Sequence, residues 1–174
     1  MQQSTRAPSA TLPKGSGFPQ PLAEPLGDQS PTPGPAPLVG TWKLLSYEVR
    51  YPDGSVSYPW GPDAQGFLIY SADGYMMATL CDAHRPRFGG NDLVHASPED
   101  QAQAARTYLS YGGPYERQGQ TLVHHVQVSL FPNWVGQDQV RVIEALEGDR
   151  LTLRTQPLLI AGKVGTAYLI WQRV

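Results

Sequence analysis

The sequence predicts a mainly β protein, an antiparallel up-and-down barrel of eight or nine strands with one internal helix. Strand-like segments rich in aromatic and β-branched residues recur from Leu38 to the end of the 174-residue chain. Gly-containing turns separate most of them at hairpin spacing, and only one segment has both the start and stop signals of a helix. A meander of this many strands usually closes on itself, because closure removes the unpaired strand edges.

The N-terminal part differs in composition from the rest. Residues 1–37 hold nine of the 17 prolines, and the stretch "SPTPGPAP" ends this segment. Such a composition buries too little apolar surface to fold. We expect residues 1–37 to be a disordered Pro-rich tail and residues 38–174 to form one barrel domain.

The first strands follow directly from turn signals. Residues 40–51 form the first predicted strand, which ends at the Asp-Gly turn of residues 52–55, and a short strand "VSYPW" follows. Residues 67–71 and 75–80 then read as a hairpin around Asp73-Gly74.

The single helix is predicted over residues 98–110. Ser97 fits the N-cap and Pro98 the first helical position, while Glu99 and Asp100 complement the positive end of the helix dipole. Gly112 or Gly113 follows the expected last turn. A narrow apolar stripe on this helix favours a cover on the barrel.

The remaining strands are predicted from residue 114 onward. Residues 114–131 contain a Gly turn at 117–120, residues 139–156 contain one at 147–150, and residues 164–174 form the last strand.

Composition also limits the partners. The 13 Lys and Arg residues nearly balance 15 Asp and Glu, without a basic run, so neither nucleic acid nor a membrane is an expected partner. The single cysteine, Cys81, allows no internal disulfide. No signal-peptide-like apolar region occurs near the N-terminus, so we expect a cytoplasmic protein. No cofactor is expected, and a homodimer is left open.

Two adjacent histidines stand in the segment "TLVHHVQVSLFPNWVG". Because side chains alternate along a strand, one face carries Leu122, His124, Val126, Val128 and Leu130, and the other carries Val123, His125, Gln127, Ser129 and Phe131. Only one histidine can face the interior. The His125 face is by default a solvent-facing row, and the alternative is a ligand-lining row, since apolar Val123 and Phe131 flank it.

The predicted ligand site is built on that alternative. An inward imidazole titrates near neutrality, and an inward arginine can bind a carboxylate or enolate by two hydrogen bonds. Trp134 is expected to cover the barrel rim or to contact the ligand there. The predicted ligand-binding residues are Tyr75, Met77, His125, Gln127, Ser129, Trp134 and Arg141, of which His125, Arg141 and Tyr75 are the catalytic candidates. No metal site is expected, since His124 and His125 diverge and His84 and His95 lack ligand spacing.

Several motifs together resemble a known family. Gly40-Thr41-Trp42 opens the first strand and Arg173 closes the last, and the ordered set "LVGTWKLLSYEV", "GFLIYSADGYMMA", "YGGPYE" and "DRLTL" is similar to the bacterial and fungal lipocalin-like domains, which are calycin-type barrels. The resemblance implies that the arginine stacks on the tryptophan and seals one barrel end. It further implies an interior that binds a small apolar or amphipathic organic molecule. The alternative is a cofactor-free enzyme with isomerase or cyclase-type acid/base chemistry in the same cavity.

Overall fold

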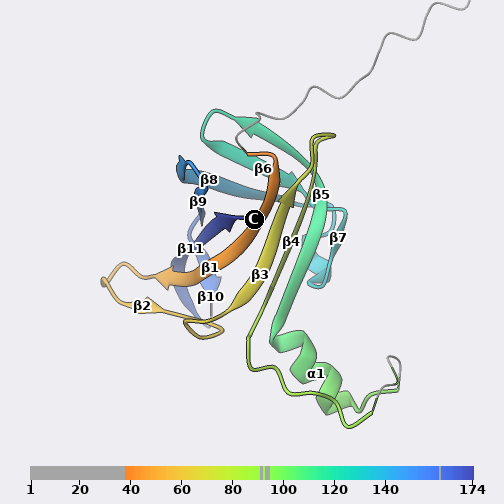
Figure 1. The fold of residues 1–174 in the computed structure, drawn as a ribbon. Helices are drawn as coiled ribbons and strands as arrows, with labels where there is room; N and C mark the ends of the chain where they lie inside the picture. Colours follow the sequence, from red (N-terminus) through yellow and green to blue (C-terminus); the bar gives the residue numbers. More distant parts are fainter. Residues whose placement is uncertain (1–37, 91, 93–94, 161) are drawn as a thin grey trace, which may run out of the picture. The chain divides into compact units, whose positions relative to one another are not determined.

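A computed structural model describes residues 38–90, 92, 95–160 and 162–174, and the predicted tail of residues 1–37 lies outside this range. The described residues form eleven strands, one α-helix and one short 3₁₀ helix (Figure 1). In chain order these are β1 (Gly40–Arg50), β2 (Val56–Ser57), β3 (Gln65–Tyr70), β4 (Tyr75–Cys81), α1 (Pro98–Arg106), β5 (Tyr108–Gln118), β6 (Thr121–His125), β7 (Val128–Ser129), η1 (Pro132–Trp134), β8 (Asp138–Glu147), β9 (Arg150–Thr155), β10 (Leu158–Ile160) and β11 (Lys163–Arg173).

Eight of these strands form a closed antiparallel barrel. The wall runs β1, β3, β4, β5, β6, β8, β9 and β11, and β11 pairs back with β1 from Trp42 opposite Arg173 to Arg50 opposite Thr166. The short strands β2, β7 and β10 extend the wall beside β1, β5 and β11 (Figure 1). The predicted antiparallel barrel with one helix is therefore confirmed.

The core of the barrel follows from strand alternation. In β4 and β9 every second residue is buried, and in β3 Leu68 and Tyr70 are buried on either side of an exposed residue, as a pleated strand with one face inward requires. Burial of this apolar face drives closure of the wall, because the hydrophobic effect rewards each side chain removed from water. The largest fully buried side chains include Trp42, Trp171, Tyr70, Leu68, Leu122, Leu151 and His124.

One end of the barrel is closed by Arg173 on Trp42. The guanidinium carbon lies 4.1 Å from the centre of the indole ring, and Nη1 donates to the carbonyl of Val39 at 2.9 Å. Gly40 permits this arrangement, because its φ is +142° and a Cβ there would lie 2.5 Å from Nη1 of Arg173. The stacked cation that the family resemblance implies is present.

The helix and the strand after it differ from the prediction. Ser97 caps α1 by accepting from the Asp100 N–H at 3.1 Å, as expected. The helix ends at Arg106, because Tyr108 already pairs with Cys81 in the β4–β5 ladder, and α1 buries none of its residues. The apolar cover expected on the barrel is therefore wrong. Within the described residues, no helix has the length and apolar character needed to cross a bilayer.

Candidate functional site

The interior of the barrel encloses a cavity of about 380 Å³. Each of the eight wall strands contributes at least one lining side chain, and the segments around Trp60, Trp134 and residues 156–160 add the rest. Most of the lining is apolar or aromatic, with a few polar groups on one side, a composition typical of small-molecule sites. The wall includes Tyr47, Leu68, Ala78, Leu80, Leu109, Tyr111, His124, Arg141, Leu153, Ala167, Leu169 and Trp171.

His124 is the histidine of this cavity, which corrects the choice of His125. Leu122, His124 and Val126 are 0%, 1% and 3% exposed, so this face of β6 points inward. His125 lies on the outer face, where Nδ1 is 2.7 Å from Asp138 Oδ1 and Nε2 is 3.6 Å from Glu116 Oε1. The more apolar face of the strand turned inward, because hydrophobic burial outweighs the cost of one buried imidazole whose nitrogens are hydrogen-bonded.

The strand does not continue straight to Phe131 as predicted. β6 ends at His125, and Gln127 N–H donates instead to the carbonyl of Gly112 at 2.9 Å. Gly113 permits this approach, since a Cβ there would lie 2.0 Å from the carbonyl oxygen of His125. Val128 and Ser129 then pair with β5 as β7, so the alternation from Thr121 is lost after Val126.

His124 stands between two tyrosine hydroxyls. Its Nε2 lies 2.8 Å from the hydroxyl of Tyr70, and its Nδ1 lies 3.0 Å from that of Tyr111. Arg141 on β8 continues the network, since Nη2 donates to the Tyr111 hydroxyl at 3.4 Å and Nη1 to the carbonyl of Val140 at 2.9 Å. Four strands thus bring four polar side chains together, and Tyr111, His124 and Arg141 of these line the cavity.

The pKa values in this network shift in opposite directions. Burial lowers the pKa of His124 well below 6.5, and the neighbouring Arg141 and His125 side chains lower it further. Burial raises the pKa of Tyr70 well above 10.0, and Arg141 partly opposes that rise. At neutral pH the histidine and this tyrosine are therefore both uncharged, and the charge in the network is that of Arg141.

Trp134 also borders the cavity. The 3₁₀ helix η1 places its ring edge-on to Tyr111, with the ring centres 5.3 Å apart and the planes at 90°. Phe131 packs on the same indole at 5.9 Å. Trp134 and Arg141 are thus the two predicted ligand-binding residues that line the interior.

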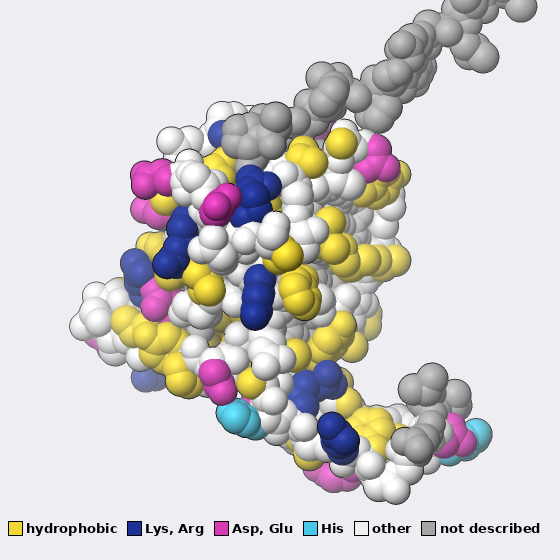
Figure 2. Space-filling view, viewed as in Figure 1, with side chains coloured by type: hydrophobic (Ala, Val, Ile, Leu, Met, Phe, Trp, Pro, Cys, Tyr) yellow, Lys and Arg dark blue, Asp and Glu magenta, His cyan; other side chains and the backbone are white. Residues whose placement is uncertain are grey.

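The other predicted site residues lie elsewhere. Tyr75 and Met77 are 51% and 42% exposed on the outer face of β4, and with Gln127 they line a shallow outer hollow. Ser129 is half-buried in β7, where its hydroxyl accepts from the Phe131 N–H at 3.0 Å. The prediction that these four residues line the cavity is therefore corrected. In β4, Met76 and Ala78 point inward, so Tyr75 and Met77 point outward. Figure 2 shows that hydrophobic side chains also occur among polar ones on the outer surface.

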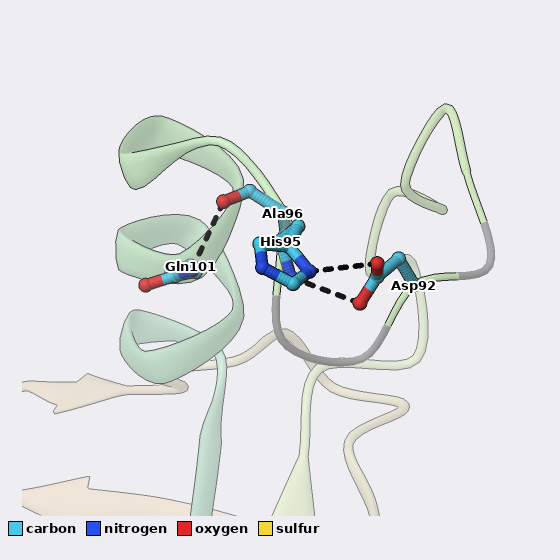
Figure 3. Close-up of polar contacts among 4 residues, drawn as sticks. All are labelled: Asp92, His95, Ala96 and Gln101. Carbon is cyan, nitrogen blue, oxygen red and sulfur yellow. Dashed lines mark hydrogen bonds and ion pairs between the residues drawn. The ribbon is translucent and has the colours of Figure 1, made fainter.

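The loop histidines form only local contacts. His95 Nδ1 lies 2.8 Å from Asp92 Oδ2, and the side chain of Gln101 donates to the carbonyl of Ala96 at 2.9 Å (Figure 3). His84 Nε2 lies 2.7 Å from Asp63 Oδ2 on the surface. Among the described residues, no group of three His, Cys, Asp or Glu side chains has the arrangement of a metal site.

Sequence reasoning missed His124, Tyr70 and Tyr111 as members of one site. A signal for His124 existed, since it is the single polar residue between Leu122 and Val126 on the more apolar strand face. Nothing in the sequence indicated its tyrosine partners, because Tyr70 is 54 residues away.

The sequence of this chain is similar to a known protein family and to a carrier protein. A family model described as a lipocalin-like domain matches residues 39–174. The 4'-hydroxy-3'-methoxypropiophenone carrier protein ppsC of Aspergillus oryzae is 32% identical over 108 residues, which cover 57% of this chain and 96% of that protein.

Two solved structures are also similar. A lipocalin-like protein from Bacteroides uniformis is 17% identical with a TM-score of 0.43, covering 79% of this chain and 99% of that one. A protein from Bacteroides eggerthii is 16% identical with a TM-score of 0.40, covering 78% and 98%. The sequence match, and not these structural likenesses, decides the family.

Proposed function

Because the chain belongs to the lipocalin-like domain family, we propose that it is a carrier that holds one small, largely apolar aromatic molecule inside the barrel. The cavity of about 380 Å³, to which all eight wall strands contribute, is the observation that carries this proposal. Its volume is near the lower end of typical ligand pockets, which suits a single-ring compound better than a long lipid.

The relative from Aspergillus oryzae supports the choice of ligand. That protein is named as a carrier of 4'-hydroxy-3'-methoxypropiophenone, an aromatic ring with a ketone and a phenol. In this chain the ring of such a compound would meet the apolar wall formed by residues such as Leu153 and Leu169. Its oxygens would meet Tyr111 and Arg141, which lie together at the polar side.

The enzyme alternative has less support. General acid/base catalysis works best with groups whose pKa lies near the working pH. The pKa of His124 is well below that range and the pKa of Tyr70 is well above it, so neither exchanges protons readily at neutral pH. The network is suited to holding a ligand oxygen in place.

A pair of matched variants tests the carrier function. Ala167 lines the cavity on β11 and is 3% exposed, whereas the neighbouring Thr166 points to the other face of the strand. Ala167→Leu fills part of the cavity, so calorimetric titration with 4'-hydroxy-3'-methoxypropiophenone should show affinity reduced by about tenfold or more. Thr166→Leu should bind like the wild type. Equal affinity in Ala167→Leu, with the fold retained, would place the ligand outside the barrel.

The cellular setting is a separate proposal. Cys81 has no disulfide partner, which suits a reducing cytoplasm. Cell fractionation would test the location, and sedimentation analysis would decide between monomer and homodimer.

A further inference from the structure

Arg141 is a buried cation at the cavity wall, and none of the described residues provides its counter-ion. Its side chain is 8% exposed, and no carboxylate among the described residues forms an ion pair with it. The guanidinium has five N–H donors, and within the described part of the chain its hydrogen bonds go to the Val140 carbonyl and, at 3.4 Å, to the Tyr111 hydroxyl. Burying a charge without a partner is costly, so an anion at this position would recover free energy.

The charge of Arg141 acts on the groups around the cavity. It lowers the pKa of His124 and opposes the rise that burial produces in Tyr47 and Tyr70. The one carboxylate that borders the cavity belongs to Asp138, and its Oδ1 is engaged at 2.7 Å with Nδ1 of His125. Arg141 is therefore the cation that acts on all three of these groups, His124, Tyr47 and Tyr70.

Hydrogen-bond donors without an acceptor occur in the same region. A neutral imidazole has one N–H, so the two bonds from His124 to Tyr70 and Tyr111 use two of the three hydrogens on these groups. When Nδ1–H donates to Tyr111, the hydroxyl hydrogen of Tyr111 is left for another acceptor, and Tyr111 lines the cavity. Trp171, another lining residue, has a buried indole N–H without an acceptor in the described part of the chain.

We infer that the carrier binds its ligand as an oxyanion, an ionised phenol or enol whose oxygen accepts from Arg141 and from the Tyr111 hydroxyl. This inference rests on the proposed carrier function and names the chemical class of the ligand. In the tautomer with the hydrogen on Nδ1, His124 acts as a positioning residue, since Nδ1–H occupies a lone pair of Tyr111 and the hydroxyl hydrogen of Tyr111 points toward the ligand. Charge-assisted bonds of this kind are about twice as strong as neutral ones.

The test uses two probes that differ in one methyl group. The phenol 4-nitrophenol ionises near neutral pH and its phenolate absorbs visible light, whereas 4-nitroanisole cannot ionise. At neutral pH the wild type should bind 4-nitrophenol about tenfold or more tightly than 4-nitroanisole. A nearby cation should also lower the apparent pKa of the bound phenol by about 1 or more, whereas a purely apolar cavity would raise it.

Variants connect this effect to the named residues. Arg141→Met should reduce the preference for the phenol to near unity and leave the bound phenol neutral, and Arg141→Lys should restore part of both effects. Arg154→Met is the matched control, because Arg154 lies on the outer face of β9 with Glu144 at 2.7 Å. Tyr111→Phe should weaken phenolate binding by several fold. The absorbance measurement on the wild type needs no variant, so a poorly folding Arg141→Met would still leave the proposal tested.

The outcomes separate this inference from the carrier function. Equal affinity for both probes, or a raised pKa of the bound phenol, would refute oxyanion recognition and leave the carrier function standing. Binding of 4'-hydroxy-3'-methoxypropiophenone without binding of 4-nitrophenol would also refute oxyanion recognition and leave the carrier function standing. If all three compounds fail to bind, both proposals are wrong.

Discussion

Acidification should destabilise the barrel through His124. The imidazole is 1% exposed between the hydroxyls of Tyr70 and Tyr111, and Arg141 adds a positive charge nearby. Folding therefore lowers the pKa of this histidine from its usual 6.5. In the unfolded chain the same side chain is free to take up a proton.

The sign and size of the effect follow from proton linkage. Between the lowered pKa of the folded state and 6.5, the unfolded chain binds more protons, so stability falls as pH falls. Above the usual pKa, His124 contributes no pH dependence. Lowering the pH from about 7.5 to about 5.5 enters this range, and each pH unit in which only the unfolded chain is protonated costs about 1.4 kcal/mol of unfolding free energy.

Urea unfolding across that pH range measures the effect. The wild type should lose stability toward low pH, while His124→Gln, less stable at neutral pH, should lose about 1.4 kcal/mol less over the same range. His125→Gln is the matched control, since it leaves the buried imidazole of His124 in place and should keep most of the wild-type dependence. An undiminished pH dependence in His124→Gln would refute the assignment of the buried imidazole.

Two further predictions concern the barrel end and its outer face. Gly40→Ala should lower the free energy of unfolding by about 1–3 kcal/mol, measured by urea unfolding, because the new Cβ meets the Arg173 guanidinium and the φ of residue 40 is positive. In an Arg173→Met background the same substitution should cost less. Gly74→Ala, at φ +85° with open space around it, is the control, and an equal cost at both glycines would contradict the steric argument. The double variant Tyr75→Ser with Met77→Ser should leave ligand affinity unchanged in calorimetry, since both side chains lie outside the cavity, and a clear loss of affinity would point to the outer hollow.

The fold could be predicted because its signals are local. The Asp73-Gly74 turn fixes one hairpin, and the Ser97 cap with Pro98 fixes the start of the helix, each within a few residues. The end of the helix could not be predicted locally, since Tyr108 pairs with Cys81 of β4 and starts a strand in place of a further helical turn. Local propensity carries no information on such competition.

The site was only partly predictable because it depends on register. Arg141 and Trp134 line the cavity, but the choice between His124 and His125 required knowing which face of β6 turns inward. The break after Val126 depends on the close approach of Gly113 to the His125 carbonyl, which is a contact between separate strands. Sequence alternation therefore predicted one continuous strand from Thr121 to Phe131. In the structure β6 ends at His125, and Val128 and Ser129 pair separately with β5.

The pairing of β1 with β11 also has a kinetic consequence. The bond from Arg173 to Val39 spans 134 residues, so the wall closes through one of the most distant contacts in the domain. Folds dominated by such contacts form slowly, commonly in milliseconds to seconds, because the loop-closure entropy is lost before the contact forms. Until the first and last wall strands meet, no enclosed cavity exists. A ligand should therefore slow opening of the finished barrel far more than it speeds its assembly.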